Sequence, residues 1–352
     1  MRIAVLSTPF ISTPPRDYGG TELVLSELTE GLVARGHDVT LFATGDSQTS
    51  AELRACYATA QWPPDPFTDL DHVSWALRQA SQGGYDIVHV NSAAALAMAR
   101  LCPGLRVVYT IHHPHEPRLS AFYGKMKQVQ YVAISADQRS REPELTRCRV
   151  IHHGLDPLRY SWTERAEDYV CFVGRLAPEK GAHTAIDAAR AAGVRIRVAG
   201  RVHPPDRPYG QQHLTTRLAE PHVEYLGAVG PAAKAPLLRG ARALLAPITW
   251  DEPFGLILAE AMLSGCPVVA FPRGSVPELV EPGVTGFVVE SVEEMAAVIA
   301  PGGPVDRINR RQCRARAVQR FSRSRLVADH ERLYADVLEQ AARAGRAPIA
   351  AA

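Results

Sequence analysis

Short hydrophobic runs alternate along this chain with longer segments in which hydrophobic positions recur every three or four residues. The short runs are almost continuously apolar, which is typical of parallel strands covered by helices on both faces. They predict strands at residues 2–6, 38–43, 86–90, 106–111, 131–134, 149–151, 169–173, 195–199, 223–226, 243–246 and 268–271. Helical spacing predicts helices between them, for example around residues 25–32, 184–192 and 254–263. Strands that alternate with helices in this way predict α/β domains built on parallel sheets.

The alternation pauses between residues 152 and 168, where the chain is polar and has no steady period. We interpret this segment as a linker between two doubly wound domains of similar size. The predicted domains cover residues 1–158 and residues 165–322. Beyond them, the pattern of the tail predicts continuous helix over residues 306–343.

Composition limits the class of protein without giving a function. The 352 residues suffice for two domains, and 46% hydrophobic with 22% charged residues is near the globular average. Lysine plus arginine minus acidic residues is 39 − 37 = +2, so no electrostatic footprint for nucleic acid is present. Six cysteines without a C-x-x-C pair favour reduced thiols over a disulfide framework or a zinc site. No apolar run is long enough for a signal peptide or a membrane span, and we expect a cytoplasmic protein.

Ligands of parallel sheets bind beyond the carboxyl ends of the strands, so loops that follow strands are candidate sites. The segment WDEPFGLILAEAM follows a predicted strand and begins a helix near Phe254. The amides of Phe254, Gly255 and Leu256 are then an anion site at the start of that helix. Glu252 and Glu260 would lie about 12 Å apart along a helix, farther than the roughly 5–9.5 Å of a glycoside hydrolase pair. They either hold different parts of an extended ligand or are a capping and a solvent-facing residue.

Two further loops carry candidate binding residues. In FVGRLAPEKG, Arg175 and Lys180 follow a strand and precede a helix, which suits a diphosphate, although solvated loop cations are the alternative. Gly19 and Gly20 lie between the first strand and the first long helix, with Thr21 as a candidate helix cap. Both glycines permit close approach of a ligand, or they serve a turn that needs positive φ. The pattern is not G-x-G-x-x-G, so a dinucleotide fingerprint is absent.

Histidines cluster after the strand at residues 106–111, in TIHHPHEP. His112, His113 and His115 could move a proton or orient a hydroxyl there. No carboxylate or cysteine near them has the spacing of a metal ligand, so a metal site is disfavoured. His152 and His153 also follow a strand, and a role in the linker is their default interpretation.

Taken together, these segments resemble the retaining glycosyltransferases of family 4, which have the GT-B fold. The matching motifs are EPFGLILAEAM with its Glu252-x7-Glu260 spacing, GRLAPEKG, and the N-terminal GGTE. VIHHGLD is similar to the hinge pattern of the family, with His153 in place of the usual asparagine. The resemblance covers roughly residues 1–335. It implies two Rossmann-like domains that face each other across a cleft, with a last helix, residues 323–345, that packs back on the N-terminal domain.

The resemblance also implies roles for individual residues. Arg175 and Lys180 would bind the diphosphate of a nucleotide sugar, against which the loop of Gly19 and Gly20 would lie. Glu252 would bond hydroxyls of the donor sugar and Glu260 the ribose hydroxyls. The amides of Phe254, Gly255 and Leu256 would bind phosphate or sugar oxygens. His112 would contact the donor sugar beside the reacting carbon.

On the same basis, we expect transfer of a sugar from a nucleotide sugar, with UDP as the base most common in the family, to a hydroxyl acceptor. Members of the family need no metal, and this chain has no D-x-D motif. We therefore expect neither a metal nor another cofactor. The alternatives are a sugar-nucleotide epimerase or another non-transferring enzyme of the same fold, and a silent binding subunit. The acceptor, the oligomeric state and any peripheral contact with a membrane stay open.

Overall fold

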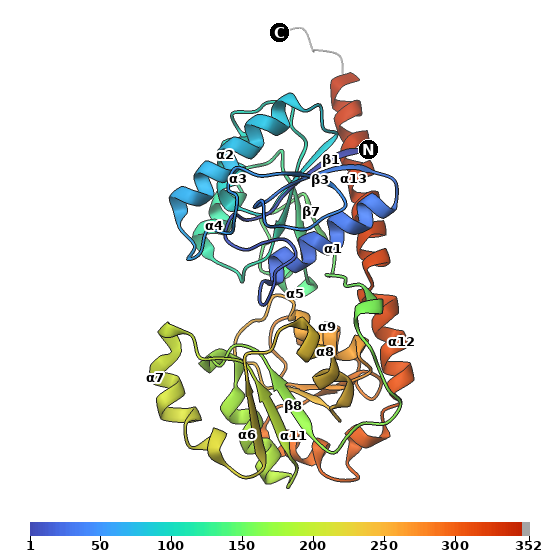
Figure 1. Ribbon diagram of the computed structural model, residues 1–352. Coiled ribbons are helices and arrows are strands. Elements are labelled where there is room, and N and C mark those ends of the chain that lie inside the picture. Colours follow the sequence, from blue (N-terminus) through green and yellow to red (C-terminus); the bar gives the residue numbers. More distant parts are fainter. Residues whose placement is uncertain (347–352) are drawn as a thin grey trace. The chain divides into compact units, whose positions relative to one another are not determined.

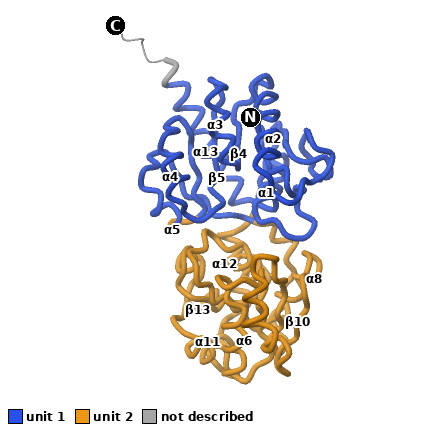
Figure 2. Tube along the Cα trace, turned by 90° about the vertical axis from the view of Figure 1, so that its left-hand side faces the viewer, with its two compact units in different colours: residues 1–134, 138–154, 323–352 blue, residues 135–137, 155–322 orange. Residues whose placement is uncertain are grey.

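The chain folds into two compact units, each built around its own parallel sheet (Figure 2). The structure is a computed structural model that describes residues 1–346, with side chains as far as Arg343. Among the described residues, unit 1 contains residues 1–134, 138–154 and 323–346, and unit 2 contains residues 135–137 and 155–322.

Unit 1 is built on a seven-stranded parallel sheet with the strand order β3-β2-β1-β4-β5-β6-β7. Its central strands are buried on both faces, as the continuous apolar runs predict. The strands are β1 (Arg2–Leu6), β2 (Asp38–Phe42), β3 (Glu52–Arg54), β4 (Ile87–Val90), β5 (Val107–Ile111), β6 (Gln130–Ala133) and β7 (Cys148–Val150). The helices that begin in this part of the chain are α1 (Gly20–Ala34), α2 (Pro66–Gln82), α3 (Ala93–Ala99), α4 (Pro117–Tyr123) and α5 (Ala136–Ser140).

Unit 2 is built on a six-stranded parallel sheet with the strand order β10-β9-β8-β11-β12-β13. The strands are β8 (Val170–Val173), β9 (Ile196–Ala199), β10 (Val223–Gly227), β11 (Leu244–Ala246), β12 (Val268–Ala270) and β13 (Gly286–Val288). The helices are α6 (Ala182–Ala191), α7 (Arg207–Tyr209), α8 (Pro231–Gly240), α9 (Leu256–Leu263), α10 (Val276–Leu279), α11 (Val292–Ile299) and α12 (Arg310–Phe321). In both units the central strand order reverses beside the first strand, which is the doubly wound arrangement that the sequence predicts.

Every predicted strand is present, within one residue at either end. The pattern missed β3 and β13, which are three residues long and lie at sheet edges. β13, with the sequence GFV, begins with glycine and offers only two apolar residues, too few for a recognisable run. β3, with the sequence ELR, is mostly polar.

The predicted continuous helix over residues 306–343 is wrong, because the helical backbone stops at Ser322 (φ −78°, ψ 151°). α12 ends at Phe321 and α13 (Arg323–Arg346) begins at Arg323, so that Ser322 alone separates the two helices. The chain changes units twice near this break, after residue 154 and after residue 322. The first change comes four residues earlier than the predicted boundary at 158, because Leu155 already bonds to unit 2: its amide donates to the Phe321 carbonyl at 2.9 Å.

α13 belongs to unit 1, where it packs beside α1 (Figure 1). Arg323 at its start forms an ion pair with the buried Glu27 of α1. Farther along, Glu331 accepts hydrogen bonds from Arg35 at 2.7 Å and pairs with His37 at 2.8 Å. The Tyr334 hydroxyl lies 2.6 Å from His89 Nδ1 in the centre of the sheet. The last helix of the chain is therefore part of the core of unit 1.

Candidate functional site

In unit 2, the loop between β8 and α6 holds both predicted cations. Arg175 comes two residues after β8, and Lys180 ends a short 3-10 helix (Pro178–Lys180). Gly181 follows with φ +75° and starts α6. A Cβ at this position would lie 2.2 Å from the carbonyl oxygen of Pro247, so only glycine fits here. The backbone at Gly181 thus lies directly against the backbone at Pro247, and this close contact holds Lys180 at the carboxyl end of the sheet.

Lys180 forms an ion pair with Glu252, although the two residues are 72 positions apart in the sequence. Trp250 contacts both members of the pair. Its indole N–H donates to Glu252 Oε2 at 3.0 Å, and the Lys180 ammonium lies 4.7 Å from the centre of its ring. Glu252 is itself nearly buried, and its backbone carbonyl accepts a hydrogen bond from Ser275. The tertiary structure thus brings two of the predicted residues together in an ion pair that contacts the Trp250 side chain.

The helix that follows Glu252 begins two residues later than predicted. Gly255 (φ +76°) is the N-cap, no side chain caps the helix, and α9 starts at Leu256. The first amides of an α-helix have no partner inside the helix, so they remain available to an anion. Phe254 contributes differently, because its ring packs edge-on against Phe321 in the core. Glu252 lies in the loop before the helix, so the distance to Glu260 that a continuous helix would give does not apply.

Glu260 lies inside α9 and is almost fully buried. Its Oε1 accepts hydrogen bonds from the Lys234 ammonium at 2.5 Å and from the Tyr160 hydroxyl at 3.2 Å. A buried carboxylate needs such partners, since an isolated charge inside a protein is costly. The local sequence gives no sign of Lys234 of α8, because only the fold brings it against a residue 26 positions away. The solvent-facing alternative for Glu260 is therefore wrong.

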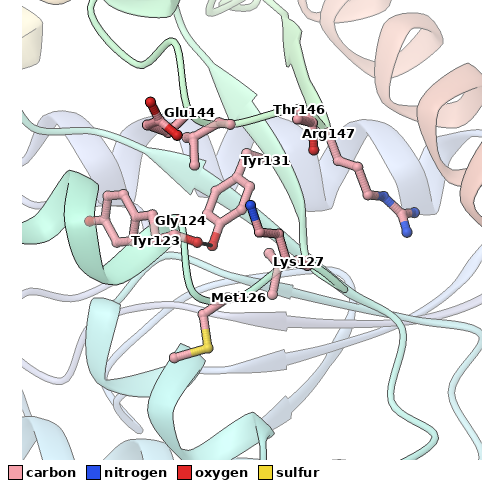
Figure 3. Close-up of a pocket in the computed structure, with 10 residues that line it drawn as sticks. Tyr123, Gly124, Met126, Lys127, Tyr131, Glu144, Thr146 and Arg147 are labelled. Carbon is pink, nitrogen blue, oxygen red and sulfur yellow. Dashed lines mark hydrogen bonds between the residues drawn. The ribbon is translucent and has the colours of Figure 1, made fainter.

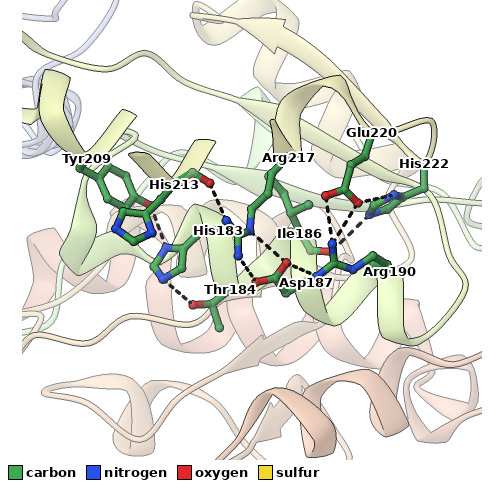
Figure 4. A network of polar contacts seen from close by, with 10 residues as sticks. All are labelled: His183, Thr184, Ile186, Asp187, Arg190, Tyr209, His213, Arg217, Glu220 and His222. Carbon is green, nitrogen blue, oxygen red and sulfur yellow. Dashed lines mark hydrogen bonds and ion pairs between the residues drawn. The ribbon is translucent and has the colours of Figure 1, made fainter. Parts of the chain in front are cut away.

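Arg175 is held by two carboxylates, Glu179 on the same loop and Asp206, whose Oδ2 lies 3.2 Å from the guanidinium. Residues after Asp206 are tied to α6 by the polar network of Figure 4. There, Arg217 forms two hydrogen bonds of 3.0 Å with Asp187 of α6. Both predicted cations of unit 2 are thus neutralised by acidic partners, and an anionic ligand would compete with those partners for them.

In unit 1, Gly19 and Gly20 form the entry to α1, with Gly19 as its N-cap. Gly19 has an extended φ of 168°, so the alternative of a turn with positive φ is wrong. A lack of space accounts for glycine at this position, because a Cβ on Gly19 would lie 2.8 Å from Glu22 Oε2 and 3.0 Å from Pro15 Cβ. Glu22 accepts a hydrogen bond of 2.6 Å from Thr8, and burial raises its pKa. The predicted cap Thr21 lies inside the helix instead.

His112 follows β5 and is half-buried among other histidines. Its Nε2 lies 2.8 Å from Asn91 Oδ1, and its ring stacks on His153 with centres 5.4 Å apart and an interplanar angle of 19°. Burial, with smaller contributions from His113 and His330, lowers the pKa of His112 to about 3. The ring is therefore neutral at physiological pH and acts as a hydrogen-bonding group rather than as a cation.

The other two histidines of the motif have structural partners. His113 Nε2 lies 2.6 Å from the Tyr123 hydroxyl, and His115 pairs with Glu142 at 3.0 Å. Tyr123 also lines a pocket of ≈ 10 Å³ beside Tyr131 (Figure 3). That volume holds at most one water molecule, so the pocket is no substrate site.

The described part of the chain contains neither a metal-binding cluster nor a helix that could span a membrane. Within residues 1–346, no group of three His, Cys, Asp or Glu side chains is arranged so that it could hold a metal ion. Over the same residues, no helix has the length and the apolar composition that a membrane span requires. The predicted independence from metals stays a prediction.

Comparisons with known proteins agree with this architecture. Residues 18–159 match the family described as Glycosyltransferase Family 4, and residues 161–300 match the family described as Glycosyl transferases group 1. A phosphatidyl-myo-inositol mannosyltransferase of Mycobacterium tuberculosis is 26% identical over 341 residues, which cover 86% of this chain and 86% of the relative.

Two solved structures superpose on nearly the whole chain. AviGT4, a glycosyltransferase involved in avilamycin A biosynthesis, has a TM-score of 0.73 at 25% identity and covers 96% of this chain and 98% of its own. Anabaena Alr3699/HepE, solved in complex with UDP and glucose, has a TM-score of 0.74 at 23% identity. That alignment covers 95% of this chain and 99% of the other.

Proposed function

Since the chain belongs to the glycosyltransferases of family 4 and has the GT-B fold, we propose that it moves a sugar from a UDP-sugar to a hydroxyl acceptor with retention of anomeric configuration. The observation that carries this proposal is the pairing of Lys180 with Glu252 at the carboxyl end of the sheet of unit 2. The pair joins two motifs that are distant in the sequence, and it adjoins the first amides of α9.

Departure of a nucleoside diphosphate builds negative charge on the phosphate oxygens, and groups that stabilise this charge lower the barrier. We assign that role to Arg175, Lys180 and the amides that open α9. In the structure the two cations are held by carboxylates, so binding of a diphosphate exchanges carboxylate oxygens for phosphate oxygens. Such an exchange costs less than desolvating a free cation, because each cation keeps an anionic partner.

Glu252 and Glu260 have separate roles in this proposal. Glu252, released from Lys180 by the diphosphate, accepts hydrogen bonds from hydroxyls of the donor sugar. Glu260 accepts hydrogen bonds from the ribose hydroxyls, and its contacts with Lys234 and Tyr160 hold the carboxylate in place. We assign the loop of Gly19 and Gly20 to the diphosphate as well.

His112 contacts the donor sugar beside the reacting carbon. A neutral imidazole suits this position, because it exchanges hydrogen bonds with hydroxyls and brings no second positive charge near a carbon that becomes electron-poor. For retention, the acceptor attacks the face that the diphosphate leaves, and a phosphate oxygen takes its proton. No step of this scheme needs a metal or another cofactor.

The choice of UDP rests on frequency in the family and on HepE, which was solved with UDP and with UDP-glucose. A cytoplasmic location is part of the proposal, because all six cysteines are free thiols in the structure.

Calorimetry with UDP, GDP, ADP and TDP tests the base, and mass spectrometry of acceptors incubated with the matching sugar nucleotides tests the transfer. NMR of the product then reports its anomeric configuration. A change of the donor without an acceptor would favour the epimerase instead. Absence of both nucleotide binding and turnover across the panel would refute the proposal. The double variant Arg175→Ala with Lys180→Ala must lower UDP affinity sharply, or the assignment of the site is wrong.

A further inference from the structure

The orientation of the Asn91 amide in unit 1 follows from its two hydrogen bonds. Its Nδ2 lies 3.0 Å from the carbonyl oxygen of Leu6, which can only accept. The amide nitrogen must therefore face Leu6, and the amide oxygen must face His112, where Oδ1 lies 2.8 Å from Nε2. A flipped amide would place two acceptors against each other at the Leu6 carbonyl.

This orientation determines the tautomer of His112. Because Asn91 Oδ1 is an acceptor, His112 Nε2 must carry the proton and donate. A neutral imidazole with a proton on Nε2 has a bare lone pair on Nδ1. None of the hydrogen bonds formed by the described residues uses His112 Nδ1, so this lone pair is available to a ligand.

The plane of the His112 ring is set by His153. The two rings stack nearly parallel, and His153 is 5% exposed. The backbone beneath His153 is held in turn by α13, because Arg325 donates to the carbonyls of His152 at 2.7 Å and His153 at 2.6 Å. Arg325 is itself anchored by Asp329 one turn later, at 2.9 Å. Helix α13 therefore supports the ring stack.

We propose that Asn91 and His153 are positioning residues that present His112 Nδ1 as a hydrogen-bond acceptor to one hydroxyl of the donor sugar. Asn91 sets which nitrogen carries the proton, and His153 sets the direction of the ring. This inference rests on the proposed function, since it assumes that His112 meets a sugar. It adds to that function the polarity of the contact: the sugar donates and His112 accepts.

The tautomer is measurable without substrate. In the nucleotide-free protein, ¹⁵N-edited NMR of the imidazole groups, with His112 assigned from the spectrum of His112→Gln, should show a proton on Nε2 and a bare Nδ1. A proton on Nδ1 of neutral His112 would overturn the proposal whatever the protein catalyses.

Substitutions of Asn91 separate positioning from folding. Asn91→Leu removes the acceptor, so a mixture of tautomers is expected, with kcat for transfer about 10- to 100-fold lower and an unchanged Kd for UDP. Asn91→Asp keeps an acceptor at the same place, so transfer should persist at high pH. Burial, with smaller contributions from His113 and His330, lowers the pKa of His112. The new carboxylate favours the imidazolium and raises this pKa, so the acid limb of kcat should move to higher pH. Equal kcat in wild type and Asn91→Leu would refute the assignment, as would an Asn91→Asp variant that is as inactive as Asn91→Leu at every pH.

A second pair of variants tests the stack. His153→Phe keeps a flat ring against His112, whereas His153→Ala removes it, so kcat should fall more in the alanine variant while UDP binding in unit 2 stays unchanged. Equal kcat in the two variants refutes the role of His153. If the wild type transfers no sugar from any donor, the proposed function fails, whereas the NMR result still decides the tautomer. If the wild type transfers normally and all these variants do too, only the present inference fails.

Discussion

Replacing Lys180 by methionine removes a cation that has two interaction partners in turn, Glu252 in the unliganded chain and the diphosphate in the proposed complex. The change therefore deletes a contact of the complex and also leaves Glu252 as an unpaired carboxylate close to the phosphates. Glu252→Gln has the opposite consequence for UDP. It releases Lys180 from its ion pair and removes the negative charge that competes with the phosphate.

The two effects differ in size as well as in sign. A hydrogen bond to a charged group contributes about 1.5–3 kcal/mol, so Lys180→Met should weaken UDP binding about 10- to 100-fold. The Lys180–Glu252 pair is partly exposed, with 21% and 12% of the two side chains accessible, and such pairs contribute about 0.2–1 kcal/mol. Freeing Lys180 from it should tighten UDP binding about 1.4- to 5-fold in Glu252→Gln.

Calorimetry with UDP and with the UDP-sugar separates these effects. In Glu252→Gln, the affinity for the UDP-sugar should fall relative to that for UDP, because the contact with the sugar hydroxyls is weakened. In the Glu252→Gln background, loss of Lys180 should cost more UDP affinity than in the wild type, since no ion pair then competes with the phosphates for Lys180. Arg195→Ala, at an exposed cation of unit 2, is the control and should leave both affinities unchanged. If Glu252→Gln weakens UDP binding as much as Lys180→Met does, the exchange of partners is refuted.

Three further predictions concern stability and need no ligand. An alanine in the left-handed region of φ costs roughly 1–2 kcal/mol. Gly181→Ala should lower the free energy of unfolding by well over this amount, because the new Cβ also collides with the Pro247 carbonyl. Gly193→Ala, with a similar φ of +67° and open space, is the matched control, and equal losses in urea unfolding would contradict the collision. Arg310→Ala leaves three backbone carbonyls of unit 2 without their donor and should cost about 2–5 kcal/mol in the same assay; a loss under about 1 kcal/mol would mean that water replaces the guanidinium. Burial lowers the pKa of His330 to about 4, below the unfolded value of about 6.5. The contribution of the neutral His330 ring to the free energy of unfolding is therefore complete above about pH 6.5. It is lost as the pH falls toward 4, at about 1.4 kcal/mol per pH unit. His330→Leu should make the free energy of unfolding depend less steeply on pH in this range. An unchanged slope would refute the burial of a neutral ring.

Local sequence predicted most of the fold because the strands of a covered parallel sheet must be apolar on both faces. This requirement leaves continuous runs such as VVYTI, which are visible without any tertiary information. It does not extend to the edge strands β3 and β13, whose sequences ELR and GFV give no continuous apolar run. Nor does it reveal the break at Ser322, where a residue with ordinary helical neighbours adopts an extended conformation beside the bridge to Leu155. Breaks of this kind depend on what the chain packs against and not on its own period.

In the candidate site, too, local sequence identified some residues and only the fold identified others. The spacing of charged residues and glycines after strands named Lys180, Glu252 and Glu260 as candidates, because the carboxyl ends of parallel strands face one edge of the sheet. It could not name Lys234 or Asn91, since each acts through a residue more than twenty positions away. A lysine and an asparagine carry no local sign of the partner that they will meet.

By itself, then, the sequence determined the two α/β units, the order of their strands along the chain, and the loops where binding residues gather, because these follow from hydrophobic period and chain direction. The tertiary structure decided which charges neutralise each other, where α13 packs, and which nitrogen of His112 carries its proton. Those properties depend on distances between side chains that are remote in the sequence. Hydrogen bonds and ion pairs act over a few ångströms, so only the folded chain can choose their partners.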